Sequence, residues 1–232
     1  MLAVGAGSEA PLFWLANHVR RIVATDIYGE GEFAYREARA DMLSDLTAFA
    51  PYPYRQDHLE VRWMDAREMA FPDASFDAVF SLSSIEHFGH PGDIARASAE
   101  IGRVLRPGGH ALIVTECLLS HHPMDWPLLN TVIKALTFGR RCPDATPRNR
   151  QADCCTPGEL QRRIVTPSGL RLMQRLDLSV SPETFENVTR LHPDGKLEPA
   201  TGRRYPHLVL RAYGAPWTSV CLPLEKAANA PT

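Results

Sequence analysis

No stretch of this sequence approaches the ~20 consecutive apolar residues that a transmembrane helix requires, so no membrane span is predicted. An excess of charge of one sign is also lacking: the chain has 25 Lys and Arg residues and 27 Asp and Glu residues, and its formal net charge is -2. A chain so close to neutrality has no electrostatic preference for nucleic acid or for an anionic membrane surface. We therefore expect neither of these as its main partner.

Paired cysteines are lacking as well. The five cysteines are an odd number, and none are spaced as the C-x-x-C pairs of a zinc site. They are Cys117, Cys142, Cys154, Cys155 and Cys221. The adjacent His121 and His122 have no companion ligand at a fixed spacing, so we interpret them as loop residues. We expect reduced thiols, a cytoplasmic location and no metal site.

The composition is that of an ordinary globular protein, with 232 residues of which 44% are hydrophobic and 22% charged. This fits a single domain, residues 1–232, with insertions. Residues 117–157 hold many prolines, cysteines and histidines around the apolar segment Trp126–Phe138, which indicates an insertion over a ligand crevice; the alternative is a plain surface excursion. Residues 181–206 are a second variable stretch, and we expect both to set substrate choice.

Apolar runs alternate with helical patterns through the first half of the chain, which is typical of a parallel sheet with crossover helices. The predicted strands are Leu2–Val4, Arg21–Thr25, Leu59–Trp63, Phe76–Ser81, His110–Thr115, Gly169–Val180, His207–Tyr213 and Ser219–Pro223. The predicted helices are Pro11–His18, Phe33–Phe49, Asp93–Leu105 with a cap at Gly92-Asp93, and Pro157–Ile164 with a Thr156–Glu159 capping box.

The most informative stretch is the glycine turn Gly5-Ala6-Gly7, which follows an apolar strand and opens a helix. A second apolar strand ends in a carboxylate, Asp26, about twenty residues later. Glycines let the backbone approach a ligand, and an acid at this position accepts hydrogen bonds from ribose hydroxyls. The pattern predicts a shelf for a nucleoside.

Nucleotide-binding domains rarely start without a preceding segment, and this chain begins directly in an apolar strand at Met1. We expect that N-terminal helices are missing before it, or that a neighbouring copy covers this edge in a homo-oligomer.

Two longer segments extend the pattern. Residues 65–79 read DAREMAFPDASFDAV, and residues 100–109 read EIGRVLRPGG. Together with the glycine turn and Asp26 they resemble, in order, the motifs of class I S-adenosylmethionine-dependent methyltransferases of the small-molecule type. The resemblance covers roughly the first half of the chain. It implies an α/β, Rossmann-like fold: a three-layer αβα sandwich around a mostly parallel, seven-stranded sheet.

The resemblance also implies S-adenosyl-L-methionine as the cofactor, S-adenosyl-L-homocysteine as its product, and methyl transfer to an O, N or C atom of a small-molecule acceptor. It assigns Asp26 to the ribose hydroxyls, Asp65 to the adenine amine and the Ala66 amide to a ring nitrogen. A structural role as strand-end turn acids is the alternative for both aspartates. The expected cofactor-binding residues are Gly5, Ala6, Gly7, Glu9, Asp26, Ile27, Asp65, Ala66, Ser81, Leu82 and His87.

Residues 81–88 leave the fourth strand at the edge where ligands of open parallel sheets bind. His87 is the candidate general base, because its unperturbed pKa near ~6.5 suits proton removal at neutral pH. The alternative is a histidine that positions the cofactor or packs beneath it. Glu86 is interpreted as orienting a helix end or joining a polar network.

Two positions depart from the family pattern. Ala3 stands where members usually carry an acid, and Glu9 replaces the last glycine of the turn. We hypothesise that Glu9 substitutes for the missing acid and meets the cofactor's ammonium group. The alternative is that Glu9 only caps its helix.

Two other functions remain open from the residues. A nicotinamide-dependent oxidoreductase would use the glycine turn, but it gives no role to residues 65–79 and 100–109. A non-catalytic, cofactor-binding accessory subunit is compatible with the altered glycine turn.

Overall fold

The computed structural model describes residues 1–118, 132, 135–136, 154–176, 189–190, 209–212 and 215–228. The chain divides into two compact units. The first comprises Met1–Thr115, Gln161–Leu176 and Cys221–Thr232, and the second comprises Glu116–Leu160 and Asp177–Val220. The predicted insertion and variable stretch fall in the second unit, while all expected cofactor-binding residues fall in the first.

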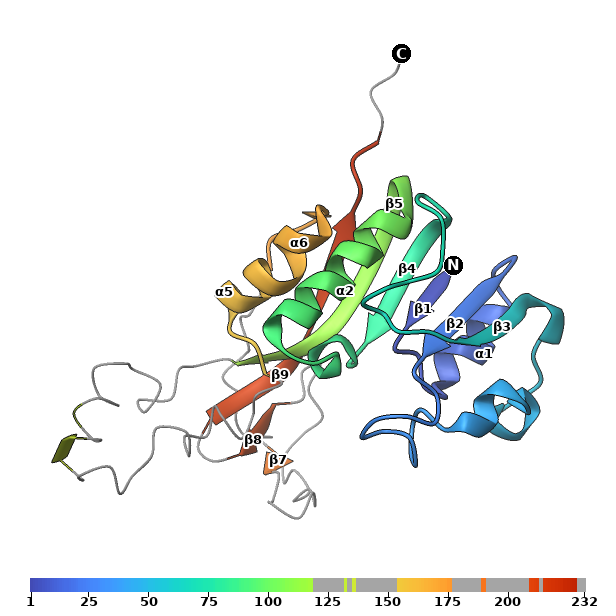
Figure 1. Ribbon diagram of the computed structural model, residues 1–232, viewed down its shortest axis with the longest axis horizontal. Helices are drawn as coiled ribbons and strands as arrows, with labels where there is room; N and C mark the ends of the chain where they lie inside the picture. Colours follow the sequence, from blue (N-terminus) through green and yellow to red (C-terminus); the bar gives the residue numbers. More distant parts are fainter. Residues whose placement is uncertain are drawn as a thin grey trace. The chain divides into compact units, whose positions relative to one another are not determined.

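The first unit is built on a sheet whose strands run in the order β3-β2-β1-β4-β5-β9 (Figure 1). Neighbouring strands from β3 to β5 are parallel. The bounds are β1 Leu2–Val4, β2 Ile22–Asp26, β3 Leu59–Trp63, β4 Phe76–Leu82, β5 Leu105–Leu118 and β9 Ala215–Glu225, the last two continuing into the second unit. The predicted strands of the first half are confirmed to within a few residues.

Strand order reverses between β1 and β4, since β2 and β3 lie on one side of β1 and β4 and β5 on the other. In register, Val4 lies beside Thr25, and Asp26 lies beside Trp63. The carboxyl ends of these strands therefore meet at one edge of the sheet, where open α/β sheets bind ligands.

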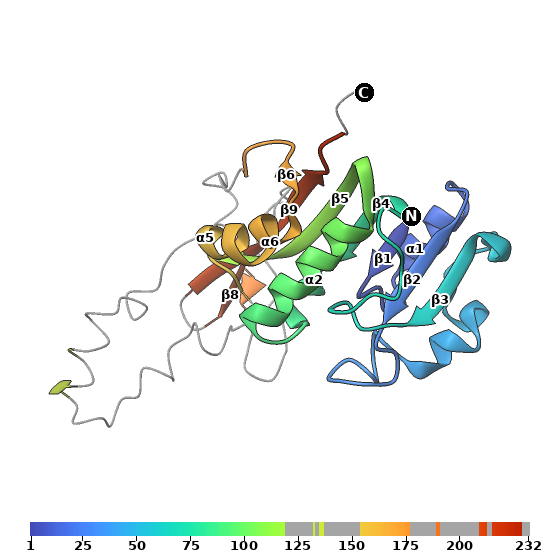
Figure 2. The ribbon, with the colours of Figure 1, turned by 45° about the horizontal axis from the view of Figure 1, so that its top comes forward.

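Helices lie on both faces of this sheet. Helix α1 (Ala10–Ala16) lies behind the strands and α2 (Pro91–Val104) in front of them in both views (Figures 1 and 2). Helix α2 begins earlier than its predicted cap: His90 is the N-cap, and the Asp93 carboxylate accepts a hydrogen bond from the His90 N–H at 3.0 Å. Its apolar stripe buries Ile94, Ala97, Ile101 and Val104, as helical spacing predicts.

The predicted helix Phe33–Phe49 is wrong. The chain instead forms a loop and two short 3₁₀ helices, η1 (Ala40–Leu43) and η2 (Leu46–Phe49). Asp45 interrupts the helical pattern, because its carboxylate accepts hydrogen bonds from the Thr47 and Ala48 N–H groups and starts a new turn. Two other short helices, η3 (Gln56–His58) and η4 (Ile85–His87), precede β3 and follow β4.

The segment Pro107-Gly108-Gly109 lies inside the span of β5. Leu105 pairs with Phe76 and His110 with Ala78, so the intervening residues form a bulge. Gly108 has φ +75°, and its N–H donates to the Lys226 carbonyl at 2.9 Å, which fastens the bulge to the end of β9.

The helical stretch after the insertion crosses the boundary between the units as α5 (Pro157–Leu160), the π-helical segment η7 (Gln161–Val165) and α6 (Thr166–Ser168). The predicted capping box is confirmed, because the Glu159 carboxylate accepts from the Thr156 N–H at 2.9 Å and from its hydroxyl at 2.8 Å. The following strand β6 (Arg171–Leu172), antiparallel to β9, is shorter than predicted. Residues 177–180 of that prediction lie outside the described residues.

In the second unit, β8 (Leu210–Ala212) pairs with β7 (Thr189–Arg190) in parallel and with the start of β9 in antiparallel orientation. The described residues thus contain nine strands, of which β6 and β7 have two residues each. The other seven match the expected number, and the α/β fold class is confirmed. Of Trp126–Phe138 the structure describes only Val132, Ala135 and Leu136, and His121, His122 and Cys142 lie outside the described residues. Over the described part of the chain, no helix has the length and apolarity needed to cross a membrane.

Candidate functional site

The glycine turn between β1 and α1 adopts a backbone that favours glycine. Gly5 and Gly7 have φ values of +63° and +47°. A Cβ on Gly5 would lie 2.7 Å from the Ser84 Cβ and 2.8 Å from the Phe88 ring. The segment after β4 therefore packs directly on the turn, and a side chain at Gly5 would separate the two.

Asp26 ends β2 beside this turn. Its carboxylate accepts hydrogen bonds from the Gly7 N–H at 2.9 Å and from the Ile27 N–H at 2.7 Å. Burial raises the pKa of Asp26, and these two hydrogen bonds oppose the shift. Each carboxylate oxygen accepts one of these bonds, so each keeps a second acceptor position for a ligand hydroxyl.

Glu9 lies at the N-cap of α1, yet its side chain makes no capping hydrogen bond within the part of the chain that the structure describes. Its Oε2 atom is buried without a hydrogen-bond partner among the described residues. Burial, and secondly the Asp26 carboxylate, raise the pKa of Glu9 to about 7. A buried carboxyl oxygen without a partner is costly unless a ligand donates to it.

Tyr28 completes this side of the site and was missed by the sequence reasoning. It is 3% exposed, and its hydroxyl donates to the Gly7 carbonyl at 3.0 Å. Burial raises the pKa of the Tyr28 hydroxyl, and the Asp26 and Glu9 carboxylates add to the shift. The position of Tyr28 in the sequence could have identified it, because it lies two residues after Asp26, at the carboxyl end of β2 where the ligand is expected.

Asp65 follows β3 at the same edge, with Ala66 buried beside it. Arg67, which the sequence reasoning did not single out, binds the Asp65 carboxylate. Its Nε lies 2.9 and 3.0 Å from the two oxygens, and its Nη2 lies 2.6 Å from Oδ2. This ion pair holds the pKa of Asp65 below its usual range.

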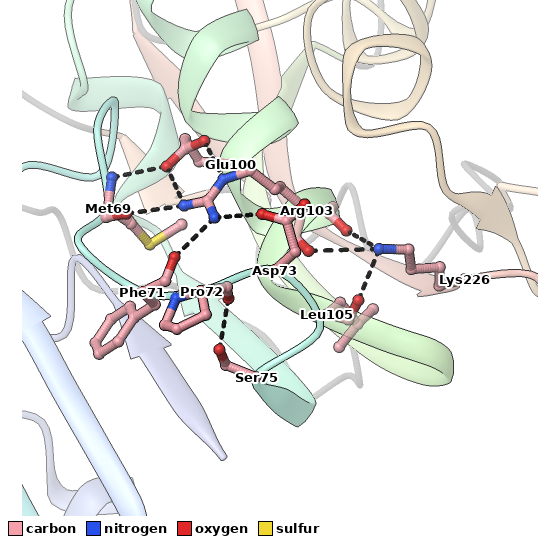
Figure 3. A network of polar contacts seen from close by, with 10 residues as sticks. Met69, Phe71, Pro72, Asp73, Ser75, Glu100, Arg103, Leu105 and Lys226 are labelled. Atoms are coloured by element: carbon pink, nitrogen blue, oxygen red, sulfur yellow. Dashed lines mark hydrogen bonds and ion pairs between the residues drawn. The ribbon is translucent and has the colours of Figure 1, made fainter.

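A polar network explains why the segments 65–79 and 100–109 occur together (Figure 3). On α2, Glu100 accepts a hydrogen bond from the Met69 N–H at 2.7 Å. Arg103 donates to Glu100, to the Phe71 carbonyl at 2.7 Å and to Asp73 at 2.8 Å. Glu100 and Arg103 of segment 100–109 thus fix the backbone of segment 65–79, which begins at Asp65.

The end of β4 and the segment after it bring three further predicted residues to this edge. Ser81 is 1% exposed, and its Oγ has no hydrogen-bond partner among the described residues. Leu82 ends β4 and Ser84, two residues on, donates to the Gly5 carbonyl at 2.6 Å. His87 is exposed on η4, and its ring centroid lies 4.7 Å from that of Phe33.

Glu86 is buried, with 4% of its surface exposed, and accepts a hydrogen bond from the Thr115 hydroxyl at 2.8 Å. Glu86 therefore has a polar partner, as one of its two predicted roles requires, and links η4 to β5. The turn that carries His87 is anchored by this buried bond.

These residues fit a nucleoside cofactor that carries a cationic amino acid arm. Asp26 keeps acceptor positions for ribose hydroxyls, and the glycine turn admits close backbone approach. The Glu9 Oε2 atom is a buried acceptor with no hydrogen-bond partner in the described part of the chain. The fold and the site define a Rossmann-like, nucleoside-cofactor-binding domain.

Comparison with known proteins relates about the first half of the chain to one family. Residues 2–113 match the sequence model of a methyltransferase domain. The 27-O-demethylrifamycin SV methyltransferase of Amycolatopsis mediterranei (strain S699) is 31% identical over 109 residues, 47% of this chain and 35% of that protein. The O-methyltransferase cnsE of Penicillium expansum is 38% identical over 78 residues, 33% of this chain and 26% of that protein. The chain thus spans about a third or less of the length of these two relatives.

A solved S-adenosylmethionine-dependent methyltransferase of Methanosarcina mazei has the same fold, with a TM-score of 0.51 and 17% identity over 97% of this chain and 92% of that chain. Residues 2–113 thus match the methyltransferase family, and the fold is that of a class I, S-adenosylmethionine-dependent methyltransferase. The family's cofactor is S-adenosyl-L-methionine. The nicotinamide-dependent oxidoreductase considered from the glycine turn is set aside, because the matched family model is that of a methyltransferase.

Proposed function

We propose that this chain is an S-adenosylmethionine-dependent methyltransferase that moves a methyl group to an O, N or C atom of a small molecule by in-line displacement. The proposal is carried by three features that meet at one sheet edge of a methyltransferase domain: Asp26, the glycine turn, and a buried Glu9 oxygen with no hydrogen-bond partner among the residues that the structure describes. The bound cofactor supplies an activated methyl group on a positively charged sulfur, so the protein's task is alignment and exclusion of water.

In this proposal Asp26 accepts the ribose hydroxyls, with Ile27 beside it, and Gly5, Ala6 and Gly7 admit the cofactor backbone. The adenine amine meets Asp65, sharing that carboxylate with Arg67, and the Ala66 amide meets a ring nitrogen. Ser81 and Leu82 border the methionine arm, and the buried Ser81 hydroxyl is available to it.

Glu9 binds the cofactor's ammonium group and replaces the acid that family members usually carry at the position of Ala3. The absence of a capping bond from the Glu9 side chain, among the described residues, supports this role over that of a helix cap. The nearby Asp26 carboxylate makes this end of the crevice favourable for a cation.

His87 removes the proton from the acceptor atom during transfer. Its exposure on η4, at the carboxyl end of β4, gives an acceptor access to the ring, and the buried Glu86–Thr115 bond holds the turn in place. If His87 is the base, His87→Gln abolishes transfer even at saturating cofactor; if His87 only positions the cofactor, transfer at saturating cofactor is retained and only the cofactor affinity falls.

The names of relatives support a small-molecule acceptor. One relative is named for the demethylated rifamycin on which it acts and another is an O-methyltransferase. The second unit, with the predicted insertion 117–157 and variable stretch 181–206, is proposed to select the acceptor.

Calorimetric titration with S-adenosylhomocysteine tests the cofactor site. We expect one molecule bound per chain and a loss of about tenfold or more in affinity for Asp26→Asn, because a charged acceptor of two hydroxyls is replaced. Asp57→Asn, a change of the same kind at an exposed residue before β3, is the matched control and leaves affinity unchanged. Equal affinities of Asp26→Asn and the wild-type protein would remove the assignment. Binding without any methyl transfer would instead favour the accessory role.

A further inference from the structure

The segment after Asp26 and Tyr28 forms a closed loop, Gly29–Ala38, which replaces the first part of the predicted helix Phe33–Phe49. Its ends are joined because the Gly29 N–H donates to the Ala38 carbonyl at 2.8 Å. Inside it, the Phe33 carbonyl accepts from the Arg36 and Ala38 N–H groups at 3.1 and 3.0 Å. Loops of this kind, closed at the neck and packed on their own backbone, keep a defined shape.

This loop lies against the glycine turn. A Cβ on Gly7 would be 3.0 Å from the Glu37 carbonyl oxygen, which is tighter than ordinary side-chain contact. Just before the loop, the Tyr28 hydroxyl donates to the carbonyl of the same Gly7. The backbone of the loop is therefore held on the turn from both of its ends.

The loop also reaches the other side of the crevice. The loop follows β2 in the chain, yet the ring of its residue Phe33 lies 4.7 Å from the His87 ring, at an interplanar angle of 59°. His87 follows β4, and β1 lies between β2 and β4 in the sheet. The loop must therefore pass over the carboxyl end of β1, where the proposed function places the cofactor.

We propose that Phe33 is a further positioning residue of the transfer site, which holds the His87 ring and the Gly29–Ala38 loop together across the glycine turn. An exposed imidazole has several open rotamers, and contact with a half-buried aromatic ring selects among them. Because the contact bridges the two sides of the crevice, it also restrains release of a bound cofactor. The inference rests on the proposed cofactor site and adds a residue that the family motifs do not contain.

The rate of S-adenosylhomocysteine release, followed by stopped-flow displacement, tests the bridge. We expect about three- to tenfold faster release from Phe33→Ala, the range that loss of one aromatic pair produces. Tyr35→Ala is the matched control, since Tyr35 is an aromatic residue of the same loop that is 93% exposed, and its release rate stays at the wild-type value. His87→Ala releases the product as fast as Phe33→Ala, and the double variant is no faster than either one. Phe33→Tyr retains slow release.

A spectroscopic measurement reports the contact itself. The Phe33 ring current displaces the imidazole proton resonances of His87, and Phe33→Ala removes that displacement while Tyr35→Ala preserves it. If Phe33→Ala does not fold, Phe33→Leu, which keeps an apolar side chain without the ring, takes its place in both experiments.

Failure of the inference is distinguishable from failure of the proposed function. If the wild-type protein binds S-adenosylhomocysteine and Phe33→Ala releases it at the wild-type rate, Phe33 has no positioning role and the cofactor site stands. Additive effects of Phe33→Ala and His87→Ala likewise overturn the bridge. If the wild-type protein does not bind S-adenosylhomocysteine at all, the proposed function fails, and the inference with it.

Discussion

Replacing Glu9 with glutamine tests the charge that the crevice offers to the cofactor's ammonium group. Burial and the neighbouring Asp26 carboxylate raise the pKa of Glu9 to about 7. With that value, about one tenth of the protein carries an ionised Glu9 at pH 6 and about nine tenths at pH 8. Since only the carboxylate attracts the ammonium group, Glu9 contributes an increase of about tenfold in cofactor affinity across this interval.

The assay is calorimetric titration of S-adenosylhomocysteine between pH 6 and pH 8 into the wild-type protein, Glu9→Gln and Glu30→Gln. The cofactor's own amino group titrates in all three experiments, so the difference between variants isolates Glu9. We expect Glu9→Gln to bind more weakly than the wild-type protein at pH 8 and to approach it at pH 6. Glu30 is exposed on the loop after β2, and its substitution leaves the curve unchanged. Parallel pH curves for Glu9→Gln and the wild-type protein would refute the reasoning.

The stability of the free protein changes with pH in the opposite sense. The pKa of Glu9 is raised from 4.5 in the unfolded chain to about 7 in the folded one, so the folded state holds this proton more tightly. Folding stability is therefore lost as the pH rises from 4.5 through 7, and is constant above that range. In Glu9→Gln this loss of folding stability is absent. Urea unfolding of the variant and the wild-type protein at pH 5 and pH 8 measures the difference in unfolding free energy. An equal pH dependence in both proteins would show that Glu9 is not shifted.

Three further substitutions have defined outcomes. Gly102→Ala places a Cβ 1.8 Å from the Ser168 carbonyl oxygen, so α2 and α6 must separate, at a cost of about 3 kcal/mol in unfolding free energy. Gly92→Ala, on the same helix with no atom within 4 Å of the new Cβ, is its control and changes stability by less than about 1 kcal/mol in urea unfolding. Lys226→Met removes the Nζ donor from the Gly102 carbonyl at 2.7 Å and lowers the unfolding free energy by about 1–3 kcal/mol, whereas Lys226→Arg retains most of it. Asp65→Asn lowers S-adenosylhomocysteine affinity by about tenfold in calorimetry, and unchanged affinity would place the adenine elsewhere.

The sheet and its ligand edge could be predicted because they depend on local signals. Buried parallel strands read as short apolar runs, and the strand-end acids Asp26 and Asp65 mark where those runs stop. The helix on the front face could be predicted from the spacing of its apolar residues, although its first residues could not. The His90–Asp93 bond that sets its start uses a histidine N-cap, which is not among the usual capping residues.

The loop after β2 could not be predicted for a physical reason. Residues 33–49 carry apolar side chains at helical spacing, but the Asp45 carboxylate competes for backbone N–H groups and the glycine turn supplies tertiary contacts. Both effects depend on the folded chain. For the same reason, the contact between Phe33 and His87 has no signature in the sequence, since the two residues come from different strand ends.

The Arg67–Asp65 pair and the polar network of α2 show a similar limit. The resemblance to the family motifs identified Asp65, Glu100 and Arg103. Their roles became clear only from the hydrogen bonds that they make. Arg103 fixes the backbone carbonyls of Met69 and Phe71, so a motif residue can matter through structure alone.

The most direct test of the central claim is transfer of a labelled methyl group from S-adenosylmethionine to the small-molecule fraction of a cell extract. The account predicts a labelled small molecule with the wild-type protein and a greatly reduced yield with Asp26→Asn at the same cofactor concentration. A protein that binds S-adenosylmethionine but labels nothing, or that labels equally well without the Asp26 carboxylate, would contradict it.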